Sequence, residues 1–229
     1  MNPERDVTGR DGNEDGSAEP ADESASGRRL AVPLETLAVL NWLGDTGIDG
    51  VEDRFNKVLG DDLTVETEQV KIGYAEQETV PVQFDSDERA GARVPLSSPL
   101  KGNALVLFPM DSANKAAALM LQRAVDDLSS VSTEMGRDAL TELCNMMANG
   151  FVDEWATVFE TTIDTGSPIA VQDPEQSHIY RVLKHYDAGM YITSHLHIPD
   201  YDIDGIIYVF PGEERFVTKI SKVGLEVIE

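Results

Sequence analysis

Apolar side chains recur at intervals of three and four residues in two long stretches of the chain, as they do in amphipathic helices. In the first stretch, Pro33 suits a first helical turn and is followed at helical spacing by Leu34, Leu37, Leu40 and Leu43. Gly44 and Gly47 then interrupt the pattern. We therefore predict that this helix ends there and that a second helix covers residues 49–59.

In the second stretch, Ser132 or Thr133 can cap a long helix that runs to about residue 148, and residues 151–160 predict another helix. A further helical pattern, rich in Ala, Leu and Met, runs from Ser112 as its N-cap to about residue 128. A short final helix is expected from about residue 213. Short apolar runs predict strands at residues 63–72, 79–84, 104–108, 161–163, 179–185, 190–198 and 205–210.

The order of these elements recurs along the chain. GNALVLFP at residues 102–109 resembles GIIYVFP at residues 205–211, and aligning Phe108 with Phe210 gives an offset of 102 residues. The segments LAVLN at 37–41 and TELCN at 141–145 give an offset of 104 residues. The agreement favours two copies of one helix–helix–strands unit, at about residues 32–128 and 132–225. Chance similarity between apolar strands is the alternative.

The first thirty residues have a different composition from the rest. They are rich in Asp, Glu, Gly, Ser and Ala and contain almost no large apolar side chains, so they cannot bury enough surface to offset the entropy of an ordered chain. We expect residues 1–30 to be a disordered acidic tail and residues 31–229 to be the folded domain. A docking peptide is the alternative interpretation of the tail.

The chain is strongly acidic, with 42 Asp and Glu against 18 Lys and Arg and a formal charge of −24. Nucleic acids and anionic membranes are bound by basic patches, so neither is expected as a partner. Acid that is spread along the chain suits a cytoplasm near molar salt, where self-repulsion is screened. We interpret the chain as halophilic, the alternative being an ordinary acidic protein. No membrane span or secretory signal is evident, which predicts a cytoplasmic protein.

A narrow polar stripe runs along the predicted helix that begins near Thr133. Asp138, Glu142, Asn145 and Asn149 lie within an arc of about 60° at 100° per residue. The opposite face is apolar, with Leu140, Leu143, Met147 and Phe151. A plain solvated face would also be polar, but asparagine is a poor residue for a helix interior. Two asparagines in mid-helix therefore point to a function.

With these residues the sequence resembles the CheC/CheX/FliY phosphatases, which act on the chemotaxis response regulator CheY. The family signature is Asp or Ser, three residues, Glu, two residues, Asn, twenty-two residues and Pro. Asp138, Glu142, Asn145 and Pro168 match all four positions at this spacing. The resemblance covers about residues 32–225. It implies an α+β fold of two pseudo-symmetric halves, which share one largely antiparallel sheet with the long helices side by side on one face.

The resemblance also implies a reaction and a role for each residue of the stripe. The substrate would be an aspartyl phosphate on a CheY-type regulator, and Asn145 would orient the hydrolytic water. Glu142 would pair with a lysine of the regulator, while Asp138 and Asn149 would bind the partner and Pro168 would be structural. The regulator would supply its own Mg²⁺, so no cofactor or metal of this chain is expected.

The first copy departs from the signature. Asn41 remains, but Leu34, Ala38 and Thr64 replace the Asp or Ser, the Glu and the Pro. We therefore expect one intact site, in the second copy, and a degenerate one in the first. A phosphatase is the leading hypothesis, and a non-catalytic adaptor that binds CheD or the regulator is the alternative.

Two other features have less specific patterns. His195 and His197 lie on one side of a predicted strand, but a metal site needs three or four ligands, so surface or packing roles are expected. Cys144 is the single cysteine and has no basic neighbour in the sequence. We expect it to be a buried, unreactive thiol.

Overall fold

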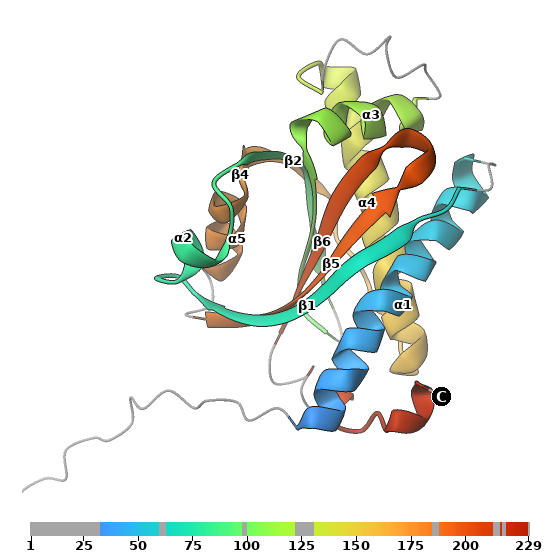
Figure 1. The fold of residues 1–229 in the computed structure, drawn as a ribbon, viewed down its shortest axis with the longest axis vertical. Helices are drawn as coiled ribbons and strands as arrows, with labels where there is room; N and C mark the ends of the chain where they lie inside the picture. The colour runs from blue at the N-terminus through green and yellow to red at the C-terminus, as the bar shows by residue number, and fades with distance from the viewer. Residues whose placement is uncertain are drawn as a thin grey trace, which may run out of the picture. The chain divides into compact units, whose positions relative to one another are not determined.

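The computed structural model describes residues 33–59, 63–97, 100–121, 131–184, 188–212, 216 and 219–228. Figure 1 shows their arrangement. The helices are α1 (Leu34–Leu59), α2 (Val80–Gln83), α3 (Met110–Met120), α4 (Glu134–Val158) and α5 (Glu175–Leu183), with 3-10 turns η2 (Pro199–Tyr201) and η3 (Leu225–Val227). The strands are β1 (Glu66–Glu76), β2 (Glu88–Leu96), β3 (Gly102–Pro109), β4 (Ile169–Pro174), β5 (Ala188–Ile198) and β6 (Ile203–Pro211).

The described strands form one sheet in the order β1-β5-β6-β3-β2-β4, with every neighbouring pair antiparallel. Exchanging β1 with β4, β2 with β5 and β3 with β6 reproduces this order in reverse. The sheet is therefore pseudo-two-fold symmetric about the β3–β6 pair. Because β1 pairs with β5 and β4 with β2, each half completes the sheet of the other. The predicted α+β fold with one antiparallel sheet is confirmed.

The two long helices are each continuous, which corrects the prediction that each stretch holds two helices. Gly44 and Gly47, which suggested the break, are instead points of close approach, since a Cβ at Gly44 would lie 2.4 Å from Val70 Cγ1 on β1. A Cβ at Gly47 would lie 2.5 Å from Phe151 Cε2, and one at Gly50 would lie 2.3 Å from the Gly150 carbonyl oxygen. Atoms cannot approach so closely, so only glycine lets α1 and α4 pack at this distance.

Two short apolar runs that predicted strands are helical. The run at 79–84 is a turn followed by α2, and the run at 179–185 lies mostly in α5, with residues 185–187 outside the described part. In α5 the buried residues Ile179, Val182 and Leu183 are spaced three and four apart, which is a helical period that a short run cannot distinguish from a strand. Residues 161–163 form no strand, whereas β2 and β4 were not predicted.

The other expected boundaries are partly confirmed. Thr133 caps α4, since its side chain accepts a hydrogen bond from the Gly136 amide at 3.1 Å. Ser112 is not an N-cap: α3 begins at Met110, and the Ser112 hydroxyl accepts a hydrogen bond from the Asp204 amide at 3.0 Å. The predicted end of this helix and most of the expected helix from 213 lie outside the described residues.

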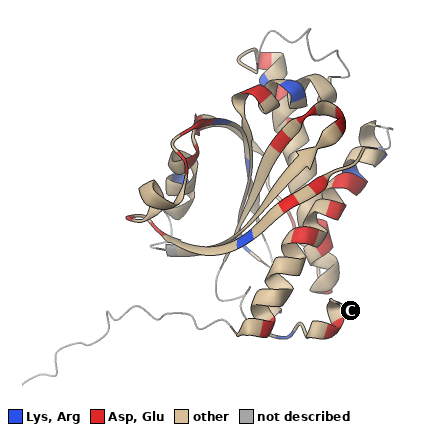
Figure 2. Cartoon of the chain, in the orientation of Figure 1, with Lys and Arg blue, Asp and Glu red and all other residues tan. Residues whose placement is uncertain are grey.

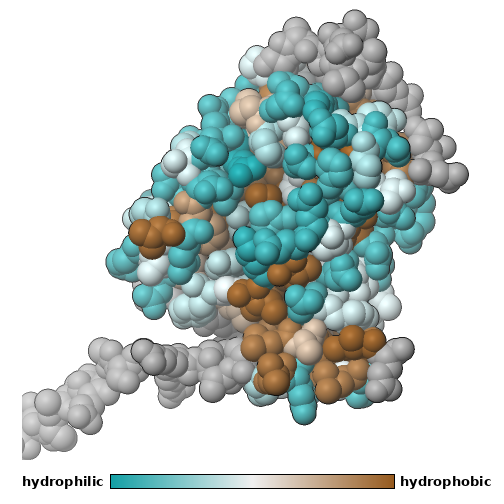
Figure 3. Space-filling view, viewed as in Figure 1, coloured by the Kyte–Doolittle hydropathy of each residue, from teal (hydrophilic) through white to brown (hydrophobic). Residues whose placement is uncertain are grey.

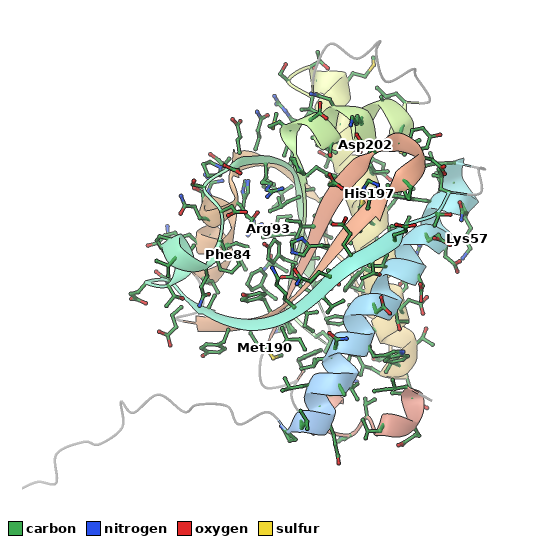
Figure 4. All side chains as sticks on the ribbon, in the orientation of Figure 1. Lys57, Phe84, Arg93, Met190, His197 and Asp202 are labelled. Carbon is green, nitrogen blue, oxygen red and sulfur yellow. The ribbon has the colours of Figure 1, made fainter. Side chains whose placement is uncertain are left out.

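The sheet has an apolar cluster on each face. The larger cluster packs α1 and α4 against the sheet around Trp155, Phe55 and Phe108. The smaller cluster lies beneath α2 and α5 and includes Phe84 and Tyr208 (Figure 4). No helix in the described part of the chain has the length and apolar content to cross a membrane. Because α1 and α4 both pack in the larger cluster, the two long helices share one face of the sheet, as the family resemblance implied. They position the candidate site.

Candidate functional site

The polar stripe lies on α4, which is held by its opposite face. Leu140, Leu143, Met147 and Phe151 are all buried in the main cluster. On the other side, Asp138 and Glu142 are exposed and Asn145 and Asn149 are half-buried. With the other described residues, neither carboxylate forms an ion pair or a side-chain hydrogen bond. Both carboxylates are therefore available to a partner.

The two asparagines of the stripe are joined by hydrogen bonds. Asn149 Nδ2 donates to the Asn145 carbonyl oxygen at 2.8 Å and to Asn145 Oδ1 at 3.2 Å. Thr165 Oγ1 donates to Asn149 Oδ1 at 2.8 Å. Asn145 Nδ2 donates no hydrogen bond to another described residue. The carboxamide of Asn145 is thus oriented from one side and open on the other.

Thr165 belongs to the segment that leads to Pro168. This segment is fixed against β2, because Thr165 forms a bridge with Leu96 and the Gly166 amide donates to the Pro95 carbonyl oxygen at 2.7 Å. Pro168 follows and is half-buried. The fold thereby brings the segment that leads to Pro168 close to Asn145. The hydrogen bonds of Asn149 with Thr165 and with Asn145 connect the two. No spacing in the sequence indicated Thr165.

The equivalent positions of the first half lie elsewhere. Trp155 Nε1 donates to the Leu43 carbonyl oxygen at 3.0 Å and Gly50 meets Gly150, so α1 and α4 run antiparallel. Asn41 consequently lies near the Trp155 end of α4, whereas Asn145 is at the middle of that helix. Asn41, Leu34, Ala38 and Thr64 are all exposed.

Carboxylates crowd the surface of the helix pair (Figure 2). Burial raises the pKa of Asp49, and the neighbouring Asp45 raises it further. The pKa of Glu154 is raised by burial and then by Asp53 and Asp49. Both shifts indicate that this surface disfavours further negative charge.

Cys144 and the histidines are separate from the stripe. Cys144 is fully buried, as expected, and burial raises the pKa of its thiol. His197 Nδ1 lies 2.7 Å from Asp204 Oδ1. Among the described residues, one group of three side chains could hold a metal ion, namely Glu68, His197 and Asp204. This group is on the sheet face opposite α4.

The chain is similar to the CheC-like family and to solved structures of FliY, FliM and the chemotaxis protein CheX. The model of the CheC-like family matches residues 135–171, which include the whole motif. A Halobacterium salinarum protein named "Putative CheY-P phosphatase CheC1" is 29% identical over 197 residues, covering 84% of this chain and 98% of that protein.

Solved structures share the fold. FliY of Thermotoga maritima has a TM-score of 0.66 at 14% identity and covers 84% of this chain and 99% of its own. FliM in the FliG–FliM complex from H. pylori has a TM-score of 0.58 at 11% identity and covers 83% of this chain and 100% of its own. CheX of Desulfovibrio desulfuricans has a TM-score of 0.51 at 13% identity and covers 75% of this chain and 99% of its own. The motif, the relative and the fold together confirm the resemblance of this chain to the CheC-like family.

Proposed function

We propose that this protein dephosphorylates the aspartyl phosphate of a CheY-type response regulator, using the α4 stripe. The observation that supports this most strongly is the arrangement of Asn145. Its carboxamide is oriented by Asn149 and is open on an otherwise exposed face, one turn from the free carboxylate of Glu142. The similarity to a protein named for CheY-P dephosphorylation supports the same substrate class.

An aspartyl phosphate is a reactive acyl phosphate, so hydrolysis needs no nucleophile from the phosphatase. It needs a water in line with the leaving carboxylate and neutralisation of the phosphoryl charge. Asn145 Oδ1 keeps one lone pair for such a water, and Nδ2 can donate beside it. Orientation of one water can lower the barrier by several kcal/mol. The Mg²⁺ and the lysine that neutralise charge would belong to the regulator.

The remaining residues of the stripe have roles in docking and positioning. Glu142 would pair with the regulator's lysine, and Asp138, one turn earlier, would contact the partner's surface. Asn149 was expected to bind the partner, but its carboxamide is used by Asn145 and Thr165. We therefore assign Asn149 and Thr165 to the positioning of Asn145, and Pro168 to the shape of the segment that carries Thr165.

The experiment follows the decay of a phosphorylated CheY-type regulator with and without this protein. We expect faster decay with wild-type protein and with the Asn41→Ala variant, because the first half lacks the carboxylates. The Asn145→Ala variant should lose most of the acceleration while it remains folded. Equal losses in the two variants would contradict a single site in the second half.

A non-catalytic adaptor, binding CheD or the regulator, is the second candidate function. The exposed apolar surface over the start of α1 and η3 favours it (Figure 3). Leu34 is 82% exposed there, and Leu225 and Ile228 are also exposed. Solved FliM structures with this fold include complexes with FliG and SpeE. An adaptor would bind the regulator without changing the rate of phosphate loss.

Glu142 separates the two functions further. Removing one member of a desolvated interfacial charge pair costs about 2 kcal/mol or more, whereas an exposed pair contributes little. We expect Glu142→Ala to weaken binding to a regulator that carries a stable phosphoryl mimic, and to lower turnover. Wild-type affinity together with wild-type turnover would remove Glu142 from the mechanism.

A further inference from the structure

Three side chains with metal-ligating atoms meet on the sheet face opposite α1 and α4. They are Glu68 on β1, His197 on β5 and Asp204 on β6, which are neighbouring strands. One ligand atom from each lies within 4.8 Å of the others. Figure 4 labels His197 on this face, and Figure 2 shows acidic residues on β1 and β6. The cluster joins a nitrogen ligand to two carboxylates, so it is more than an acidic patch.

The sheet fixes the positions of all three residues. His197 and Asp204 are direct cross-strand partners, and such partners share a face of the sheet. The register of β1 against β5 shifts between Thr67 and Gln69, which leaves Glu68 as the extra residue of a β-bulge. A bulge re-aims a side chain locally, and Glu68 here faces the same side as Asp204. The Ser112 hydroxyl also holds the Asp204 amide.

A cavity adjoins the cluster and contains an unpaired polar atom. Glu68 and Asp204 line this cavity, whose volume is about 280 Å³, together with His195 and Thr193. Thr193 is only 2% exposed, and its hydroxyl has no hydrogen-bond partner among the described residues. A buried hydroxyl without a partner is costly. The cavity therefore offers room for ordered water, and Thr193, four residues along β5 from His197, is a polar partner for such water at its other end.

We propose that Glu68, His197 and Asp204 bind one divalent transition-metal ion of the zinc type. Imidazole nitrogen combined with carboxylate oxygen suits such ions, whereas Mg²⁺ and Ca²⁺ prefer oxygen alone. Three protein ligands leave the remaining position of a tetrahedral ion open towards the cavity. His197 Nδ1 and Asp204 Oδ1 lie 2.7 Å apart and would exchange this contact for the ion, whereas the Asp202 carboxylate is held at 2.7 Å by the cation of Lys115 and is left out of the site. This site is independent of the α4 stripe and of the function proposed for it.

The test is a zinc titration of the full chain after removal of metals with a chelator, measured by competition with a chromophoric chelator. We expect one Zn²⁺ per chain. The affinity should fall about tenfold or more in His197→Gln and in Asp204→Asn, as ligands are lost. The matched control is Glu76→Gln, which removes the same charge from the far end of β1 and should bind like the wild type.

Two results would overturn the proposal. One is equal zinc affinity of the wild type and His197→Gln. The bound zinc would then be an adventitious ion only, held by the acidic surface. The other would come from Co²⁺ added to the isotope-labelled wild type, a measurement that needs no folded variant. Broadening of amide resonances should centre on Glu68, His197 and Asp204. Broadening centred on another part of the chain would exclude the site.

Discussion

Asn149→Ala tests whether the second asparagine of the stripe positions the first. The substitution removes the donor at 2.8 Å from the Asn145 carbonyl oxygen and at 3.2 Å from its Oδ1. It also removes the acceptor of the Thr165 hydroxyl. The docking carboxylates Asp138 and Glu142 remain unchanged. Turnover should therefore fall while the affinity for the regulator stays constant.

The size of the effect follows from the number of hydrogen bonds. One bond, to Oδ1, holds the reacting carboxamide, and a neutral hydrogen bond contributes about 0.5–1.5 kcal/mol net. Since 1.4 kcal/mol corresponds to tenfold, turnover should fall about 2- to 10-fold. Stability should fall by roughly 1–2 kcal/mol, because alanine regains part of the loss through its helix propensity.

A double-mutant cycle with Asn145 distinguishes positioning from general loss of stability. Rates are measured well below the unfolding temperature for Asn149→Ala, for Asn145→Ala and for the double variant. If Asn149 acts through Asn145, the double variant should be no slower than Asn145→Ala alone. Thr165→Val removes the hydroxyl that holds Asn149 but leaves the Asn149–Asn145 hydrogen bonds in place, so it should lower turnover less than Asn149→Ala. Multiplicative losses in the double variant would refute the positioning role.

Three further predictions concern packing, charge and the thiol. Gly150→Ala places a Cβ 2.4 Å from the Gly50 carbonyl oxygen, so thermal unfolding should show a loss of about 2 kcal/mol, whereas Gly166→Ala, 3.4 Å from its nearest neighbour, should cost little. The raised pKa of Glu154 means that wild-type stability increases as pH falls through that pKa. Glu154→Gln should therefore be more stable than wild type at pH 7, and the gain should be smaller in 1 M salt. A variant less stable than wild type would contradict this prediction. Cys144 is buried with a raised pKa, so a thiol reagent should modify it only at the unfolding rate, and rapid modification of the native protein would disprove its protection.

The sequence predicted those features whose residues share one element. Asp138, Glu142 and Asn145 lie on one helix, so their common face follows from the helical period alone. Gly44 and Gly47 suggested a break in α1, but close contacts with β1 and α4 require them, and sequence spacing does not contain such contacts. For the same reason the pairing of Asn149 with Thr165 was not predicted.

The assignment of short strands from the sequence is limited in the same way, because local spacing does not contain the tertiary contacts. A short apolar run fits a buried strand or one side of a short helix equally well, which is why α2 and α5 were assigned to strands. Glu68 is far from His197 and Asp204 in the sequence, and it meets them only because β1 is the neighbour of β5 in the sheet. Only the topology of the fold reveals such a cluster.

The most direct test of the central claim is a single-turnover measurement of phosphate loss from the regulator. The phosphatase is present at saturating concentration, so differences in docking do not affect the observed rate. We predict that Asn145→Ala reduces this rate nearly to that of the regulator alone, while the variant binds the regulator like wild type. A rate equal to that of wild type would contradict the account, because no water positioned by Asn145 could then be responsible for the reaction.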